Sequence, residues 1–222
     1  MSAVEIITTA DGSHSLFNAE LDETYHSVHG AVQESMHVFI EHGLRHWANQ
    51  TKKKQLVILE VGFGTGLNAW LTYEKARAEG MQVAYFSIEA FPLQREVWTL
   101  LNYAPGDATF TWLHDSPWDV PVTREGFTLH KIQGKLEQTA LPTGADIVYF
   151  DAFAPSKQPH LWAYDVLEKV CRILSPEGLF VTYCARGQLK RDLRTLGLHV
   201  ETLPGPPGKK EMVRASVTRA NG

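Results

Sequence analysis

The sequence is poor in cysteine and has no long apolar run. Its two cysteines, Cys171 and Cys184, cannot build a disulfide framework, so we expect both to pack as small apolar side chains in a reducing compartment. The apolar stretches, such as 56–59, are far shorter than the roughly 20 residues that a membrane-spanning helix needs. The first residues also lack the basic and apolar segments of a secretory signal. We therefore expect a cytoplasmic protein with no membrane partner.

The chain also lacks an excess of positive charge. It has 21 Lys and Arg against 25 Asp and Glu, and the net charge of −4 argues against a protein that coats nucleic acid. A local basic patch is still compatible with this charge. The 222 residues, 44% of them hydrophobic, suit one α/β domain with a modest extension. This length leaves no room for a second catalytic domain of ordinary size.

Residues 1–54 differ in pattern from residues 55–222, and we predict an N-terminal extension followed by the main domain. The extension shows a hairpin pattern at 4–9 and 15–17 and an amphipathic helix at 33–47. From residue 55 onward strands and helices alternate, which predicts a doubly wound, mostly parallel sheet. Strands are predicted at 56–61, 83–88, 127–132, 147–150 and 179–183, helices at 67–79, 93–101, 162–174 and 188–196, and a turn at 175–178. Two late strands, 200–203 and 212–217, are expected to form an antiparallel hairpin.

The strongest motif is a glycine-rich turn between a strand and a helix. Glu60, Gly62, Gly64 and Gly66 form the pattern E-x-G-x-G-x-G. Glycines let the backbone approach a ligand, and the third glycine comes one residue earlier than in dinucleotide-binding folds. An acid at Glu60 suits a cationic ligand and would repel a pyrophosphate. The turn resembles the first motif of class I S-adenosylmethionine-dependent methyltransferases, while a packing turn and a nicotinamide site stay open as alternatives.

A second acid, Glu89, ends the next strand. A carboxylate at that place can accept hydrogen bonds from both ribose hydroxyls of an adenosine. Asp115 and the segment 133–135 fall where this fold usually contacts adenine. The order of strand, glycine turn, helix, strand and acid therefore predicts a Rossmann-like fold that binds S-adenosylmethionine. The predicted cofactor-binding residues are Glu60, Gly62, Phe63, Gly64, Thr65, Gly66, Asn68, Glu89, Asp115 and Asp151.

Asp151 follows the fourth predicted strand, at the edge of the sheet where ligands of open α/β folds bind. The loop that it opens is similar to the D/N-P-P-Y/F loop of amino-methyltransferases. An alkyl amine is mostly protonated at pH 7, and only its neutral form has the lone pair that attacks a methyl group. A carboxylate can accept an N–H, orient the lone pair and stabilise the developing positive charge. We predict Asp151 as catalytic, with Phe153 and Trp162 placed to stack on a base.

Several segments together resemble one family. They are the glycine turn, the pattern D-x-F-A-P-x-x-x-P-x-x-W at 151–162, the tail 205–212 with its K-K-E-M ending, and the segments 22–27 and 30–35. From about Ser15 to Ala215 the chain resembles the tRNA (5-methylaminomethyl-2-thiouridine) methyltransferase family, the methyltransferase half of a bifunctional wobble-uridine modification enzyme. The resemblance implies methyl transfer from S-adenosylmethionine to the 5-aminomethyl nitrogen of uridine 34 in the anticodon loop of tRNA. The flavin-dependent half, which unmasks that amine, has no counterpart here, so no flavin is expected.

The substrate side of the site is predicted from the same resemblance. Tyr25, which we count as catalytic, Glu34 and Asp22 are expected to wall the target pocket. Because tRNA is a polyanion, a local basic patch is needed, although a solvated face is the alternative for each group. Lys209 and Lys210 are the preferred backbone contacts, and the other candidates are Lys52, Lys53, Lys54, Arg186, Lys190, Arg191, Arg194 and Arg214.

The histidines of the N-terminal region do not predict a metal site. His42 and His46 stand at i, i+4, but Gly43 replaces the acid of the H-E-x-x-H pattern, and no nearby cysteine completes a zinc set. Two other functions stay open. An aminopropyltransferase similar to spermidine synthase would share the fold, but the acids that hold a polyamine do not follow Asp151. A non-catalytic tRNA-binding module is disfavoured by the intact glycine turn and Asp151.

Overall fold

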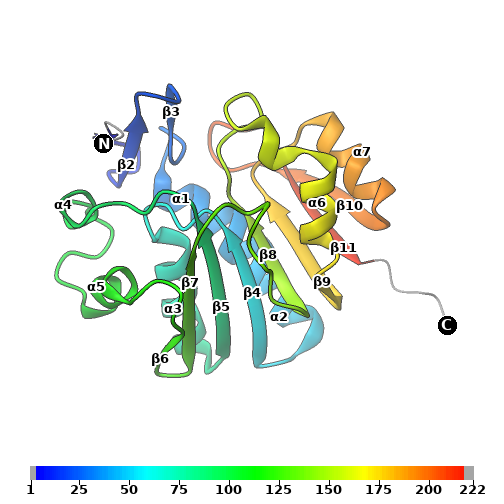
Figure 1. Cartoon of the computed structure of the whole chain (residues 1–222), viewed down its shortest axis with the longest axis horizontal. Coiled ribbons are helices and arrows are strands. Elements are labelled where there is room, and N and C mark those ends of the chain that lie inside the picture. The colour runs from blue at the N-terminus through cyan, green and yellow to red at the C-terminus, as the bar shows by residue number, and fades with distance from the viewer. Residues whose placement is uncertain (1–3, 218–222) are drawn as a thin grey trace.

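The computed structural model of the chain describes residues 4–217, so positions 1–3 and 218–222 of the two predicted regions lie outside the described residues. A large sheet forms the centre, in the order β10-β11-β9-β8-β4-β5-β7-β6 (Figure 1). Its strands are β4 (Gln55–Val61), β5 (Gln82–Glu89), β6 (Val122–Arg124), β7 (Phe127–Gln133), β8 (Ala145–Phe150), β9 (Leu174–Thr182), β10 (Leu198–Pro204) and β11 (Glu211–Val217). Strands β9, β8, β4, β5 and β7 run parallel, whereas β6, β11 and β10 pair antiparallel at the edges. The predicted α/β class and the late hairpin are confirmed.

The order of the strands reverses at β4. The next strand along the chain, β5, pairs with one side of β4, and β8 pairs with the other side. In open α/β sheets such a switch point opens a crevice beyond the carboxyl ends of the strands, because the connections leave in opposite directions. The glycine turn follows β4, Glu89 ends β5 and Asp151 follows β8, so all three lie at this crevice.

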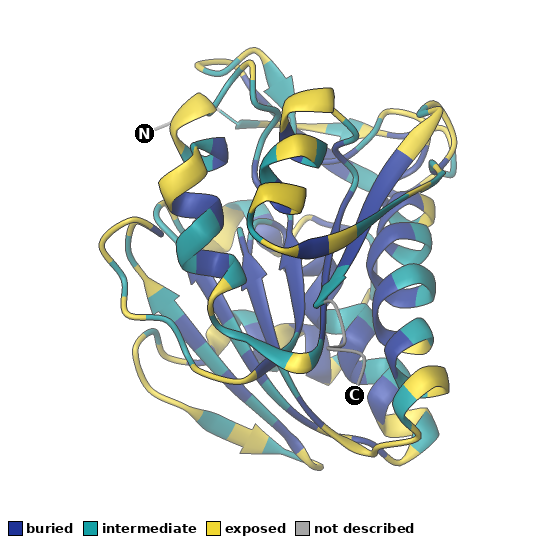
Figure 2. Ribbon diagram, turned by 90° about the vertical axis from the view of Figure 1, so that its right-hand side faces the viewer, coloured by how far each residue is buried: buried dark blue, intermediate teal, exposed yellow. Residues whose placement is uncertain are grey.

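Helices cover both faces of the sheet. They are α1 (Ala31–Ser35), η1 (Met36–Arg45), α2 (His46–Thr51), α3 (Leu67–Glu79), α4 (Arg95–Trp98), α5 (Ala108–Asp115), η2 (Pro159–Trp162), α6 (Tyr164–Cys171) and α7 (Gly187–Thr195). Alternate residues of a strand point to opposite faces, and neighbours in β4 accordingly enter different cores. Ile58 joins Phe39 of η1 and Tyr73 of α3, while Leu59 joins the apolar residues of α6 and α7. Figure 2 shows the buried strands enclosed between these helices.

The N-terminal region forms a small sheet and a long helical segment. β1 (Val4–Thr8) and β2 (His14–Asn18) pair antiparallel, as the hairpin pattern predicts, and β3 (Glu23–Thr24) pairs with β2. The predicted helix at 33–47 extends in both directions through α1, η1 and α2, and η1 has the wider π-helical hydrogen bonding. Val38 and Trp47 pack into the core of the main sheet. The boundary at residue 54 stays a prediction.

Three local predictions are wrong. The turn at 175–178 belongs to β9, where a register shift lets the strand pass Pro176, and Gly178 lies against the Ala145 carbonyl. The helix at 162–174 is split, because Ala163 is extended between η2 and α6. The helix at 93–101 is only the four-residue α4. The strands β3 and β6 and the helix α5 were not predicted, although Asp107 caps the amides of Thr109 and Phe110 at the start of α5.

Candidate active site

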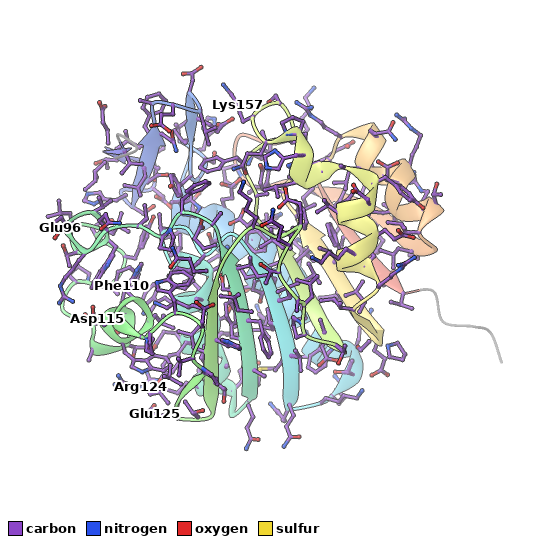
Figure 3. The ribbon with its side chains drawn as sticks, in the orientation of Figure 1. Glu96, Phe110, Asp115, Arg124, Glu125 and Lys157 are labelled. Atoms are coloured by element: carbon purple, nitrogen blue, oxygen red, sulfur yellow. The ribbon has the colours of Figure 1, made fainter. Side chains whose placement is uncertain are left out.

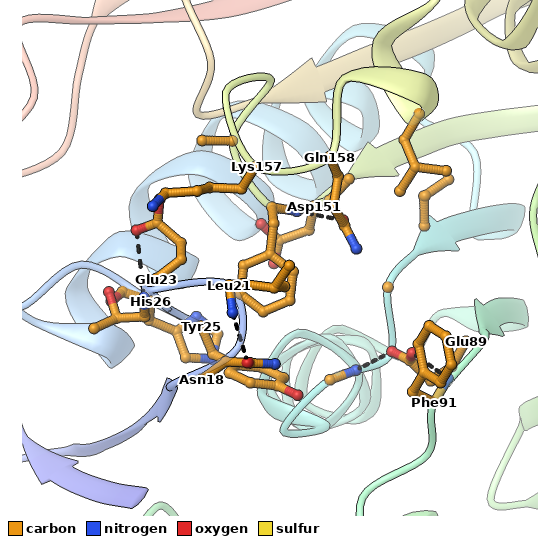
Figure 4. Close-up of a pocket in the computed structure, with 18 of the residues that line it drawn as sticks. Asn18, Leu21, Glu23, Tyr25, His26, Glu89, Phe91, Asp151, Lys157 and Gln158 are labelled. Atoms are coloured by element: carbon orange, nitrogen blue, oxygen red, sulfur yellow. Dashed lines mark hydrogen bonds between the residues drawn. The ribbon is translucent and has the colours of Figure 1, made fainter. Parts of the chain in front are cut away.

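A cavity of about 1300 Å³ lies at the switch point, between the carboxyl ends of the parallel strands and the N-terminal small sheet (Figure 4). Its walls contain the glycine turn, Glu89, Asp151 and the 22–27 segment. The volume exceeds the roughly 300–1,000 Å³ of an ordinary ligand pocket. The cavity therefore has room for a cofactor and a second ligand side by side.

The glycine turn leaves bare backbone at the cavity floor. Gly62 and Gly64 have φ values of 92° and 49°, and a side chain at Gly62 would begin 3.0 Å from the Asp151 carbonyl oxygen. Phe63, Thr65 and Asn68 complete this wall. Close backbone approach and left-handed φ values explain why this turn needs glycine.

Gly66 lies behind the cavity wall and serves packing. Its φ is 73°, and a β-carbon would lie 2.7 Å from His114 Nε2, which donates a hydrogen bond to the Thr65 carbonyl 3.1 Å away. Thr65 Oγ1 also meets His26 Nε2 at 2.8 Å. Burial lowers the pKa of His26 to about 4 and that of His114 to about 3, so both rings are neutral at pH 7. Two neutral histidines thus fix the turn from both sides.

Replacing Gly66 with alanine is expected to destabilise the fold by about 2–5 kcal/mol, because the left-handed backbone and the His114 contact are both unfavourable. Gly80 is the matched control, since it has a φ of 62° and nothing within 4 Å of its β-carbon position. Gly80→Ala should lower the free energy of unfolding by only about 1–2 kcal/mol, because only its left-handed backbone is unfavourable for alanine. Urea unfolding of both variants measures the difference, and equal losses would contradict the role of the His114 contact.

Glu89 faces the cavity from the end of β5. Its two carboxylate oxygens accept hydrogen bonds from the Gly64 amide at 3.1 Å and the Phe91 amide at 2.9 Å. Burial raises its pKa, while these amides favour the charged form. Phe91 lines the same wall with 71% of its surface exposed, a residue that the sequence analysis missed. Figure 4 shows Glu89 and Phe91 together at one side of the cavity.

Asp151 lies on the other side of the cavity floor. Its Oδ2 accepts a hydrogen bond from Asn68 Nδ2 at 2.8 Å. Burial, together with the nearby negative charge of Glu34, raises the pKa of Asp151 to about 7, although Asn68 and Lys209 favour the charged form. A carboxyl with such a pKa exchanges a proton readily near neutral pH.

Two aromatic side chains of the cavity wall contact each other. Tyr25 and Phe153 meet edge to face with ring centroids 4.9 Å apart, and both line the cavity. Tyr25 also packs on Gly64, since a β-carbon there would lie 3.3 Å from its ring. The three predicted catalytic residues, Asp151, Phe153 and Tyr25, thus all line the same cavity.

The sequence of residues 123–218 matches the model of a family described as S-adenosyl-L-methionine-dependent methyltransferase. Two relatives are named tRNA 5-methylaminomethyl-2-thiouridine biosynthesis bifunctional protein MnmC. The one from Cupriavidus necator is 31% identical over 97% of this chain and 35% of its own length. The one from Ralstonia nicotianae is 32% identical over 90% of this chain and 32% of its own length. The crystal structure of MNMC2 from Aquifex aeolicus has a TM-score of 0.84 at 27% identity, covering 99% of this chain and 72% of that chain. The chain belongs to the MnmC methyltransferase family.

The chain spans about a third of the length of these curated MnmC relatives. Membership identifies the fold as a Rossmann-like class I methyltransferase fold and the cofactor as S-adenosylmethionine. The cavity fits this group, because bare backbone at Gly62 and Gly64 lies beside the carboxylate of Glu89, and all three line the cavity. The aminopropyltransferase alternative has no support among these matches.

Four of the residues predicted to bind the cofactor or the target nucleoside do not line the cavity. Glu60 is fully buried and accepts a hydrogen bond from Ser87 Oγ at 2.6 Å, and burial raises its pKa to about 8, so its protonated form dominates at pH 7. Asp115 pairs with Arg95 on the α5 flank, which Figure 3 shows apart from Lys157. Gly66 packs on His114, as described above. Trp162 is 9% exposed and donates from Nε1 to the Phe153 carbonyl at 2.8 Å. It therefore supports Phe153 from behind and does not face a ligand.

The predicted basic patch is partly wrong. Arg214 is buried and bonded to Glu201 at 2.8 Å. Lys52, Lys53 and Lys54 precede β4, so they lie at the end of the sheet opposite to the cavity. Lys190 pairs with Glu211 at 3.1 Å, and Lys209 turns inward to pair with Glu34 in the cavity wall. The exposed candidates that remain are Lys210, Arg186, Arg191 and Arg194.

The loop after β8 meets the N-terminal segment across the cavity mouth. Lys157 Nζ lies 3.4 Å from Asp22 Oδ2, and Gln158 Oε1 accepts from the Phe153 amide at 3.3 Å. Among residues 4–217 no group of three or more His, Cys, Asp or Glu side chains could hold a metal ion. Within the same residues, no helix is long and apolar enough to cross a membrane.

Proposed function

We propose that this methyltransferase N-methylates the 5-aminomethyl group of 2-thiouridine or uridine at wobble position 34 of tRNA. The observation that carries the proposal is Asp151, a carboxyl group with a pKa of about 7 that faces a cavity wide enough for cofactor and nucleoside. The names of the MnmC relatives support the tRNA substrate. A tRNA substrate also places the reaction in the cytoplasm.

The proposed residue roles follow from the geometry. Glu89 would hold the ribose of S-adenosylmethionine, with Phe91 beside it and the glycine turn below. When bound, this cofactor supplies the methyl group that moves to the amine nitrogen. Asp151 would accept a proton from the substrate ammonium, so that the nitrogen regains its lone pair, and release that proton to solvent. The carboxylate, charged again, would then stabilise the positive charge that forms on the methylated nitrogen.

The nucleobase would lie against Tyr25 and Phe153. Their edge-to-face pair forms an apolar wall beside Asp151, and bases stack readily on aromatic rings. Trp162 fixes the Phe153 carbonyl and thereby the loop that presents Asp151. We propose that the free amine comes from a separate active site, since unmasking it is a different reaction.

Methyl transfer to tRNA tests the function directly. Purified protein is incubated with labelled S-adenosylmethionine and tRNA from cells that lack the final methylation, and the nucleosides are then separated. We expect the label in wobble uridine, and far less of it in the same time with Asp151→Asn. If a known wobble methyltransferase labels the same tRNA and this protein does not, the proposal is wrong.

The tRNA backbone is expected to contact exposed cations near the cavity mouth. Arg186 and Lys210 are exposed, and each lies close in sequence to a cavity residue, Tyr183 and Lys209. Arg186→Glu and Lys210→Glu should each weaken tRNA binding about tenfold and lower the slope of log K against log salt by about one. Lys52→Glu is the control of equal charge at the opposite end of the sheet, and binding titrations at several salt concentrations compare the three. Equal effects of all three would show nonspecific attraction only.

A further inference from the structure

Lys209 does not point to solvent, although the sequence predicts a backbone contact for it. Its ammonium pairs with the Glu34 carboxylate and lies 3.8 Å from the centre of the Tyr183 ring. All three side chains line the cavity near Asp151. A carboxylate and an aromatic face are the two groups that recognise an organic ammonium ion. Glu34, Tyr183 and Asp151 therefore form the walls of a cation cage, and the Lys209 ammonium fills it.

The walls of the cation cage are fixed by their own hydrogen bonds. Glu34 is 6% exposed and accepts from the Ser27 amide at 2.7 Å. Tyr183 donates its hydroxyl proton to the Ala152 carbonyl at 2.8 Å, directly beside Asp151. Neither wall depends on Lys209 for its position. An ammonium ion of another molecule would thus meet the same preformed groups.

The backbone that carries Lys209 is also held. The Lys209 amide donates to the Pro206 carbonyl at 2.9 Å, and Gly205 donates to the Lys210 carbonyl at 3.1 Å. Gly208 packs so closely on His29 that a β-carbon would overlap its ring. Movement of the ammonium therefore needs only rotations of the Lys209 side chain, which is 31% exposed and can turn toward the mouth.

We propose that Lys209 is an internal stand-in for the substrate: its ammonium neutralises Glu34 in the empty enzyme and leaves the cation cage when the ammonium of the substrate enters. The inference rests on the proposed amine substrate and names how that amine is selected. An empty cage would leave Glu34 buried without a partner, which is costly, whereas exchanging one ammonium for another conserves charge. A nucleoside without a positive charge cannot replace Lys209, so the exchange excludes uridines that carry no amine.

The position of Lys209 can be followed by nuclear magnetic resonance with ¹³C-labelled lysine. Because the ammonium lies over the Tyr183 ring, the ε-methylene resonance should be shifted upfield, and it is assigned by its absence in Lys209→Met. With S-adenosylhomocysteine present, 5-aminomethyluridine should move this resonance to the position of an exposed lysine. 5-Methyluridine should leave it in place. Lys75, paired with Glu79 on α3 at similar exposure, is the reference resonance that neither nucleoside moves. An unmoved Lys209 resonance at saturating 5-aminomethyluridine overturns the proposal.

Kinetics with the nucleoside give a second test. Removing the internal competitor by Lys209→Met should lower KM for 5-aminomethyluridine, by about tenfold if Lys209 fills the cage nine times in ten. Glu34→Gln should raise KM by about 10–100-fold, since the ammonium loses a charged partner. Lys75→Met is the matched control and should change neither KM nor kcat. A higher KM for Lys209→Met would identify Lys209 as an ordinary substrate contact and overturn the stand-in role.

The two proposals fail in different ways. Displacement of Lys209 by 5-aminomethyluridine without any methylation of tRNA would leave the stand-in intact and remove the proposed function. Methylation of tRNA with an unmoved Lys209 resonance would support the proposed function and overturn the stand-in role of Lys209. The resonance measurement uses the intact chain and does not depend on turnover.

Discussion

Replacing Asp151 with asparagine is expected to lower the rate constant of methyl transfer by about 10²–10⁴-fold while cofactor binding changes little. Asparagine keeps the size of the side chain and can still accept the hydrogen bond that Asn68 now donates to Asp151 at 2.8 Å. It cannot take a proton from the substrate or offset the charge that forms on nitrogen. Single-turnover rates and calorimetric titration with S-adenosylmethionine measure the two quantities separately.

Asp146 offers a matched control for Asp151. It belongs to the same strand, β8, but its carboxylate accepts from the Val57 amide at 2.9 Å and from Ser175 at 3.0 Å, at the end far from the cavity. Asp146→Asn should reduce stability and leave the rate per folded molecule unchanged. If Asp151→Asn weakened cofactor binding as much as turnover, Asp151 would belong to the cofactor site alone.

The pH dependence of the rate follows from the same carboxyl group. The reaction needs the charged form of Asp151, and the pKa of about 7 means that protonation removes this form as the pH falls below 7. We expect kcat/KM to fall about tenfold per pH unit on this acid side. Because the charge of Glu34 helps to raise the pKa of Asp151, Glu34→Gln should lower the pH at which kcat/KM begins to fall. If this pH were the same in Glu34→Gln and in the wild type, Glu34 would not act on the pKa of Asp151.

Sequence reasoning succeeds where the position of a residue depends on its own neighbours in the chain. Gly62, Glu89 and Asp151 each follow a strand, and parallel strands bring their carboxyl ends to one edge, so the strand pattern was enough to place them together. The β1–β2 hairpin and the late β10–β11 hairpin were predictable for the same local reason. The missed α5 had a signal in Asp107, the cap of its first turn.

The errors concern charged side chains whose direction is set by distant partners. Lys209 turns inward because Glu34, 175 positions away, is buried in the cavity wall. Arg214 is held by Glu201 across the β10–β11 hairpin, and Asp115 is drawn to Arg95. Glu60 follows the strand pattern correctly, but it is fully buried and bonded to Ser87 of the neighbouring strand, so it does not line the cavity. A sequence shows that such groups are charged but not which partner neutralises them.

Glu89 should dominate cofactor affinity. Glu89→Ala removes the carboxylate that would hold the ribose, and it also releases the Gly64 and Phe91 amides that now donate to it at 3.1 and 2.9 Å. Hydrogen bonds to charged groups contribute about 1.5–3 kcal/mol each, so affinity for S-adenosylmethionine is expected to fall by about 100-fold or more. Calorimetric titration measures this loss. The affinity of Glu89→Gln for S-adenosylmethionine should lie between those of the wild type and Glu89→Ala. The glutamine oxygen can still accept from one backbone amide, but its NH2 group would meet the N–H of the other.

Glu96 is the matched control for this substitution, since it is exposed on α4 beyond the cavity wall, where Figure 3 labels it. Glu96→Gln removes the same charge and should leave affinity for S-adenosylmethionine within about twofold, because exposed charges at this distance are screened by salt. Both cofactor and its demethylated product should respond alike to Glu89→Ala, as the ribose is common to them. If only one of the two lost affinity, Glu89 would act near the sulfur and not at the ribose, and the orientation of the cofactor in the cavity would have to be reversed.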